Sequence, residues 1–169
     1  MTNQTGVKTE KKPKNKALLY ALKLLSMRMH SEKELVNKLY AKKFSTAEIK
    51  DLVAKLKEKK LIDDSAFVRT YSDQLRYKAI GDVRIKFQLK RKGIKDKTIE
   101  EHFDKEAPID QKKRALDLAQ LKLRPGREKN PKEKKRIYDF LVRKGFDYEV
   151  CRDVIGKLMQ TKEDAAWDS

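Results

Sequence analysis

Residues 84–103 read RIKFQLKRKGIKDKTIEEHF, and this stretch decides the fold because the chain holds two further versions of it. Residues 34–53 read ELVNKLYAKKFSTAEIKDLV, and residues 136–154 read RIYDFLVRKGFDYEVCRDV. Self-similarity at a period near 50 residues indicates a repeat architecture. The matching apolar columns are Leu35, Ile85 and Ile137; Leu39, Leu89 and Leu141; and Phe44, Ile94 and Phe146.

The spacing inside and before each block is helical. Apolar residues at i, i+3, i+4 and i+7 predict amphipathic helices, and a longer helical stretch precedes each block, at 16–29, 65–79 and 109–123. We therefore predict an all-α chain of three tandem three-helix, helix-turn-helix-like repeats that stack into an elongated, curved solenoid. A single mixed helical bundle is the alternative. The predicted segments are a disordered basic arm (1–15), repeat 1 (16–62), repeat 2 (63–107), repeat 3 (108–160) and an acidic tail (161–169).

Helix boundaries follow from capping residues. Ser31 with Glu34, and Ser45 with Glu48, form capping-box patterns, in which the hydroxyl and the carboxylate each accept from a free backbone N–H at the helix start. Gly93 and Gly145 stand where a helix must end, because glycine adopts the left-handed cap conformation at low cost.

Charge points to the class of partner. The 169 residues include 43 Lys and Arg against 26 Asp and Glu, a net charge of +17. Such a surplus favours polyanionic partners, with nucleic acid first, an acidic protein surface second and an anionic membrane a distant third. A single Cys excludes an internal disulfide. No apolar run approaches a membrane span, and no secretory signal is evident, so we expect a cytoplasmic protein.

Residues for catalysis or metal binding do not cluster. His30 and His102 lie far apart in sequence, and Cys151 sits between apolar residues of a predicted helix, as a buried thiol does. The acidic pair Asp63-Asp64 is interpreted as a helix start. We therefore predict a binding protein without metal, cofactor or enzymatic activity.

Recurring basic residues mark a candidate contact surface. On a helical wheel Arg84 and Arg91 lie opposite the buried line, and they align with Arg136 and Arg143 of repeat 3. We expect them to form one face for phosphates or carboxylates, with a merely solvated charged face as the alternative. Phe87 on the same arc is expected to pack between repeats, with stacking on a base or partner as the alternative. The candidate contact residues are Arg84, Lys90, Arg91, Lys92, Arg124, Arg127, Arg136, Arg143 and Lys144, with Phe87 as a possible aromatic contact.

One family shares these motifs. The segment LIDDSAF at residues 61–67, followed by G-x-x-R-I-x-x-x-L-x-x-K-G-I at 81–94 and RKGFDYEV at 143–150, resembles the RecX family of RecA regulators. The resemblance spans about residues 17–160. Lys43 departs from it, because a glycine would match the turn of repeat 1, and this predicts a different cap there.

The resemblance implies binding along the RecA–DNA filament and modulation, usually inhibition, of strand exchange, ATP hydrolysis and coprotease activity. The expected partners are the RecA filament and single-stranded DNA within or near it. We expect a monomer, since no dimerisation helix is evident. Trp167, in the acidic tail, is interpreted as a loose terminal side chain, with docking as the alternative. Two other functions stay open, namely a stand-alone helix-turn-helix DNA-binding protein and an interaction module for an acidic protein.

Overall fold

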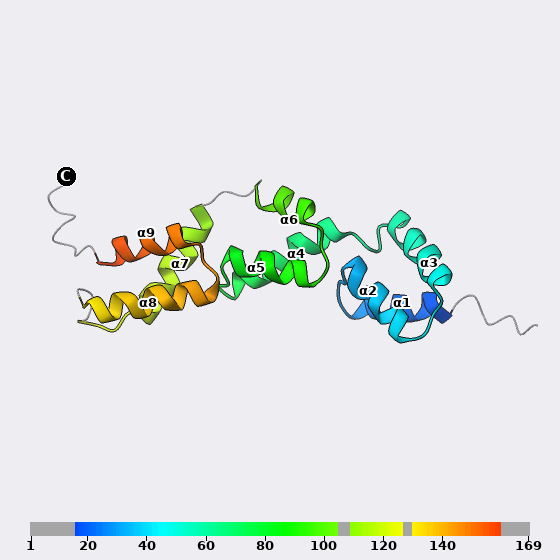
Figure 1. Ribbon diagram of the computed structural model, residues 1–169, viewed down its shortest axis with the longest axis horizontal. Coiled ribbons are helices and arrows are strands. Elements are labelled where there is room, and N and C mark those ends of the chain that lie inside the picture. The colour runs from blue at the N-terminus through cyan, green and yellow to red at the C-terminus, as the bar shows by residue number, and fades with distance from the viewer. Residues whose placement is uncertain (1–15, 105–108, 127–129, 160–169) are drawn as a thin grey trace, which may run out of the picture. The chain divides into compact units, whose positions relative to one another are not determined.

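The computed structural model describes residues 16–104, 109–126 and 130–159, which form helices joined by short turns (Figure 1). Within these ranges there are nine α-helices and no strand, which confirms the predicted all-α class. No helix in the described ranges is both long and apolar enough to cross a membrane. The helices are α1 (Lys16–Met27), α2 (Glu32–Ala41), α3 (Thr46–Glu58), α4 (Asp64–Tyr77), α5 (Asp82–Arg91), α6 (Asp96–Phe103), α7 (Ile109–Lys122), α8 (Pro131–Lys144) and α9 (Tyr148–Met159).

The chain divides after Asp63 into two compact units. Unit 1 contains α1–α3 around a core from all three helices and from Ile62, with fully buried Ala21, Leu35 and Leu39. Both predicted capping boxes are present: Ser31 caps α2 with Glu34, and Ser45 caps α3 with Glu48.

Unit 2 contains two three-helix groups, and each has its own core. Helices α4–α6 enclose a cluster that includes Phe67, Val68 and Ile99. Helices α7–α9 enclose a second cluster that includes Ala115, Ala119 and Val154. Each group therefore buries a small core of its own.

The aligned apolar columns are the core positions. All six residues of the first two columns are fully buried, which confirms the sequence alignment of the repeats. In the third column Ile94 and Phe146 are buried, whereas Phe44 is half-buried.

The turn after the second helix of each repeat has one geometry in all three repeats. Lys43, Gly93 and Gly145 have φ values of 61°, 81° and 88°. In each repeat this residue donates its N–H to the carbonyl three residues earlier, and the next residue donates to the carbonyl five residues earlier, as Phe44 does to Leu39. The expectation of a different cap in repeat 1 was therefore wrong: Lys43 adopts the left-handed conformation itself.

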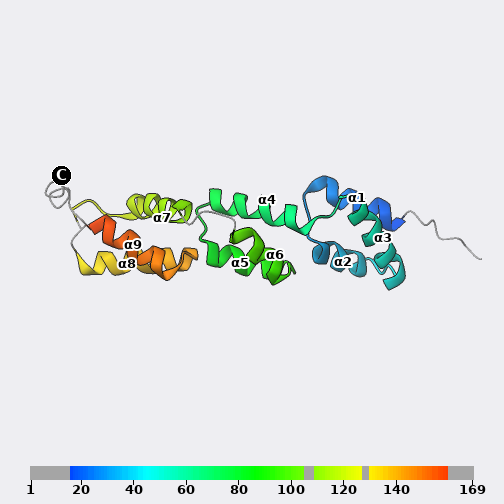
Figure 2. The same ribbon diagram turned by 90° about the horizontal axis from the view of Figure 1, so that it is seen from above.

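Close backbone contact joins repeats 2 and 3 within unit 2 (Figure 2). Gly81 donates its N–H to the Lys144 carbonyl, and Val83 donates to the Gly145 carbonyl, both at 3.0 Å. A Cβ atom built on Gly81 would overlap the Gly145 carbonyl group and the Phe146 nitrogen. Only glycine permits this approach of the start of α5 to the end of α8.

Asp82 reinforces the same junction. Its carboxylate accepts from Arg76 of α4 at 3.5 Å and from Arg114 of α7 at 3.0 Å, and its N–H donates to Gln111 at 3.3 Å. Backbone and side-chain bonds thus fix α5 against both α7 and α8. The stacking of all three repeats into an elongated, curved solenoid stays a prediction.

Candidate interaction groove

A groove of about 590 Å³ lies in unit 2 where the exposed face of α5 meets the end of α8. We call it the α5/α8 groove. No carboxylate lines it, and the residues that do combine arginines with apolar side chains. They are Val83, Arg84, Phe87, Gln88 and Arg91 from α5, with Val142, Arg143 and Gly145 from the end of α8.

Helical spacing explains the contribution of α5. Ile85 and Leu89 are fully buried in the core of repeat 2, so the opposite side of the helix is exposed. Val83, Phe87 and Arg91 recur every four residues on that side, which places them in one row. The Val83 and Phe87 residues are 53% and 60% exposed, so the expectation that Phe87 packs between the repeats was wrong.

Three of the predicted arginines meet at this groove. Arg84 donates from Nη1 to the Arg143 carbonyl at 3.0 Å, so its side chain also holds the last turn of α8. Arg91 and Arg143 are exposed, and no ion pair engages either of them among the residues that the structure describes. Their guanidinium groups can therefore accept an anionic ligand without first breaking an internal pair.

Arg136 has a different environment from Arg84, its sequence equivalent. It pairs with Glu133, which is 4% exposed, and it also donates to the Lys122 carbonyl. The hydrogen bond from Arg136, together with one from the Arg124 N–H, lowers the pKa of Glu133 to about 2. These contacts tie the start of α8 to the end of α7, and Arg136 is not among the residues that line the groove.

The remaining predicted residues lie elsewhere in unit 2. Lys90 pairs with Asp96 at 2.9 Å, and Lys92 lies over the Tyr71 ring at 5.1 Å from its centroid. Lys144 lies over Phe140 at 5.9 Å. Arg124 is an exposed residue after α7.

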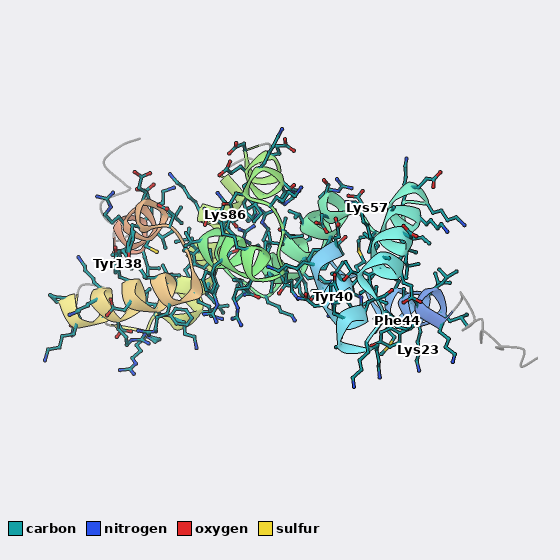
Figure 3. The ribbon with its side chains drawn as sticks, turned by 45° about the vertical axis from the view of Figure 1, so that its right-hand side comes forward. Lys23, Tyr40, Phe44, Lys57, Lys86 and Tyr138 are labelled. Atoms are coloured by element: carbon teal, nitrogen blue, oxygen red, sulfur yellow. The ribbon has the colours of Figure 1, made fainter. Side chains whose placement is uncertain are left out.

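Lys86 illustrates the other side of α5 (Figure 3). It points away from the groove toward α6, with Nζ 4.8 Å from the centroid of the Phe103 ring. Three further predictions concern residues outside the described ranges. They are Arg127, the basic arm (1–15) and Trp167.

Sequence analysis did not single out four lining residues, Val83, Gln88, Val142 and Gly145, as contacts. A helical wheel of α8 with Ile137 and Leu141 as the buried line places Val142 on the opposite arc, and an outward-facing valine is the signal that could have identified it. The role of Gly145 in the groove depends on its approach to Arg84, whose backbone and Cβ a side chain at Gly145 would overlap.

No group of three or more potential metal ligands occurs within the described ranges. Cys151 is fully buried, as predicted, and burial, followed by the charge of Asp147, raises its pKa to about 11. A protonated, inaccessible thiol is a poor nucleophile. The Cys151 thiol therefore does not offer nucleophilic chemistry, and the arginines and apolar side chains of the groove suit the binding of anionic and apolar groups.

The repeats and the groove together define a class: a small, basic, helical-repeat protein with an arginine-lined surface groove. Comparison with known proteins identifies the family within this class. Residues 17–56 match the first three-helix domain of RecX, and residues 110–155 match its third three-helix domain.

Relatives that match over most of the chain belong to the same family. "Regulatory protein RecX" of Chlorobaculum tepidum is 35% identical over 156 residues, which cover 92% of this chain and 95% of the relative. The protein of the same name from Chlorobium limicola is 36% identical over 152 residues, covering 88% and 92%. The crystal structure of RecX from Lactobacillus salivarius superimposes with a TM-score of 0.77 at 25% identity, covering 86% of this chain and 96% of that one. The chain belongs to the RecX family of regulatory, non-enzymatic proteins, which confirms the resemblance found in the sequence.

Proposed function

We propose that this protein regulates RecA by binding the RecA–DNA filament through the α5/α8 groove, and that it lowers strand exchange, ATP hydrolysis and coprotease activity. Membership of the RecX family supports the identity of the partner. The observation that carries the placement is the convergence of Arg84, Arg91 and Arg143 beside exposed Phe87.

The chemistry of the groove suits a nucleoprotein. Guanidinium groups bind phosphates and carboxylates through paired hydrogen bonds, and an exposed aromatic ring adds a surface for an apolar side chain or a base. A filament of protein and DNA presents anionic groups of both kinds. A surface that offers both charge and apolar area gains more binding free energy from such a partner than from bare DNA, because the protein and the DNA of the filament both contribute contacts.

Charge reversal of two groove arginines tests this function. Arg91→Glu/Arg143→Glu is the suitable variant, because neither side chain has an ion-pair partner among the described residues, whereas Arg84 also holds the end of α8. We expect this variant to bind RecA–single-strand–ATP filaments at least about tenfold more weakly, since two like charges then face the anionic partner. Filament binding and inhibition of RecA ATP hydrolysis are the measurements.

Arg69→Glu/Lys113→Glu is the matched control, because it changes the net charge equally at exposed positions of unit 2 that do not line the groove. Equal loss in both variants would mean that overall charge, and not the groove, binds the filament. Titrations with bare DNA and with bare RecA distinguish the two remaining alternatives. Binding to DNA alone would favour a stand-alone DNA-binding protein, and binding that requires no nucleic acid would favour an acidic protein partner.

A further inference from the structure

The α5/α8 groove leaves two requirements unmet within the described part of the chain. Arg91 and Arg143 line it without an ion-pair partner, and the Phe87 and Val83 residues beside them are more than half exposed. Neighbouring positive charges repel each other, and apolar side chains exposed to water leave the protein at a higher free energy than buried ones. A ligand that brings carboxylates together with a large apolar ring would relieve both costs.

The chain contains such a segment immediately after α9. Residues 160–169 read QTKEDAAWDS, and Trp167 is the single tryptophan of the protein. Three carboxylates, from Glu163, Asp164 and Asp168, accompany the indole against one lysine. In a protein of net charge +17, this segment complements the groove in both charge and apolarity.

The length of the segment permits it to reach the groove. Helix α9 begins at Tyr148, three residues after groove residue Gly145, and its 12 residues extend for about 18 Å. Helices α8 and α9 lie side by side and run in opposite directions (Figure 1), so a chain leaving Met159 can return along α8. Trp167 lies eight residues after Met159, and eight extended residues span up to about 26 Å, which exceeds the length of the helix.

We propose that residues 167–168 fold back and occupy the α5/α8 groove of the same molecule, with Trp167 against Phe87 and the Asp168 carboxylate between Arg91 and Arg143. The tail then acts as an internal competitor for the surface that binds the filament, and this regulatory consequence rests on the proposed function. A short tether gives a local concentration in the millimolar range. Even a weak intrinsic affinity therefore lowers filament binding by about two- to tenfold.

The single tryptophan makes the docking directly measurable without RecA. We expect the fluorescence of Trp167 in the full chain to be blue-shifted and protected from acrylamide, because the indole lies against apolar side chains. Arg91→Glu/Arg143→Glu should red-shift it and increase quenching, whereas Arg69→Glu/Lys113→Glu should keep the wild-type spectrum. A solvent-exposed spectrum in the wild-type protein, unchanged in the groove variant, would overturn the proposal.

Protein concentration distinguishes the same molecule from a second copy. An internal contact gives a spectrum that is constant across a hundredfold dilution. A shift toward the exposed spectrum on dilution would show that the segment binds another molecule, and this would overturn the intramolecular assignment.

Competition is tested with a full-length variant that removes the features of the tail. Glu163→Gln/Asp164→Asn/Trp167→Ala/Asp168→Asn should bind filaments about two- to tenfold more tightly than wild type, with the gain shrinking at high salt. Unchanged or weaker filament binding would overturn the inhibitory role. If Arg91→Glu/Arg143→Glu changes the Trp167 spectrum but leaves filament binding intact, the proposed function fails while docking stands. If the same variant weakens filament binding but leaves the Trp167 spectrum unchanged, docking fails while the proposed function stands.

Discussion

Lys43, Gly93 and Gly145 occupy equivalent turns, yet only two of them are glycines. The backbone hydrogen bonds of the turn are the same in each repeat, so the turn imposes the left-handed conformation whichever residue is present. A non-glycine residue there has its Cβ too close to the following carbonyl oxygen, which costs roughly 1 kcal/mol or more. Repeat 1 therefore carries strain that repeats 2 and 3 avoid.

Lys43→Gly should stabilise unit 1 by up to about 1 kcal/mol, because it removes that strain at an exposed position while the greater conformational entropy of glycine in the unfolded chain offsets part of the gain. Urea unfolding followed by circular dichroism measures the change. Lys42→Gly is the matched control, since Lys42 has φ −88° and gains nothing from glycine. A Lys43→Gly midpoint no higher than that of the control would contradict the strain.

Two arginines show what a sequence alignment of the repeats does not predict, namely the environment of an individual side chain. Arg84 and Arg136 are equivalent in sequence, and a wheel places both on the exposed arc. Only Arg84 lines the groove, because Arg136 is held by buried Glu133 and by a carbonyl of α7. A wheel describes one helix alone and contains no information about the neighbouring helix that captures a side chain.

At the scale of elements, the repeat 2–repeat 3 junction depends on contact between Gly81 and Gly145. Gly81 has φ −76° and ψ 156°, values that any residue adopts, so its requirement for glycine is steric and not conformational. The overlapping atoms are backbone atoms of the opposing turn, which cannot rotate away as a side chain can.

Gly81→Ala should therefore destabilise unit 2 by at least about 2 kcal/mol, because the added methyl group forces α5 and α8 apart. Thermal unfolding is the measurement, and loss of the α5/α8 groove should weaken filament binding as well. Gly156→Ala is the control: Gly156 is an exposed position of α9 where an added Cβ meets nothing within 4 Å. It should stabilise the protein by about 0.5–1 kcal/mol through helix propensity. Equal, small effects of the two substitutions would show that the junction is not close-packed.

For the whole molecule, the number of phosphates that its basic surface contacts determines how DNA binding responds to salt. Each phosphate contact releases condensed counterions, so about five contacts predict a slope near −3.5 for log affinity against log salt with single-stranded DNA. Filament binding should show a shallower slope, because part of its free energy comes from protein contacts that salt does not screen. Fluorescence anisotropy with a labelled oligonucleotide, free and in filaments, measures both slopes. A flat response to bare DNA would instead support an acidic protein partner.

Sequence alone determined the features that depend on short-range physics. Helical periodicity, the Ser31 and Ser45 capping boxes and the left-handed glycines each act within a few residues. The buried apolar columns recur in all three repeats. The all-α class, the three-helix repeats and the buried Cys151 follow from such signals, whereas the family followed from the resemblance of motifs such as LIDDSAF and RKGFDYEV.

Tertiary structure alone decided which charged residues share a surface. Arg84, Arg91 and Arg143 meet because Gly81 and Gly145, 64 residues apart, bring the start of α5 against the end of α8. The same packing draws Arg136 into a pair with Glu133 and leaves Phe87 exposed. These outcomes depend on contacts between distant segments, and each segment by itself has the same periodicity and charge whether or not its neighbour is present.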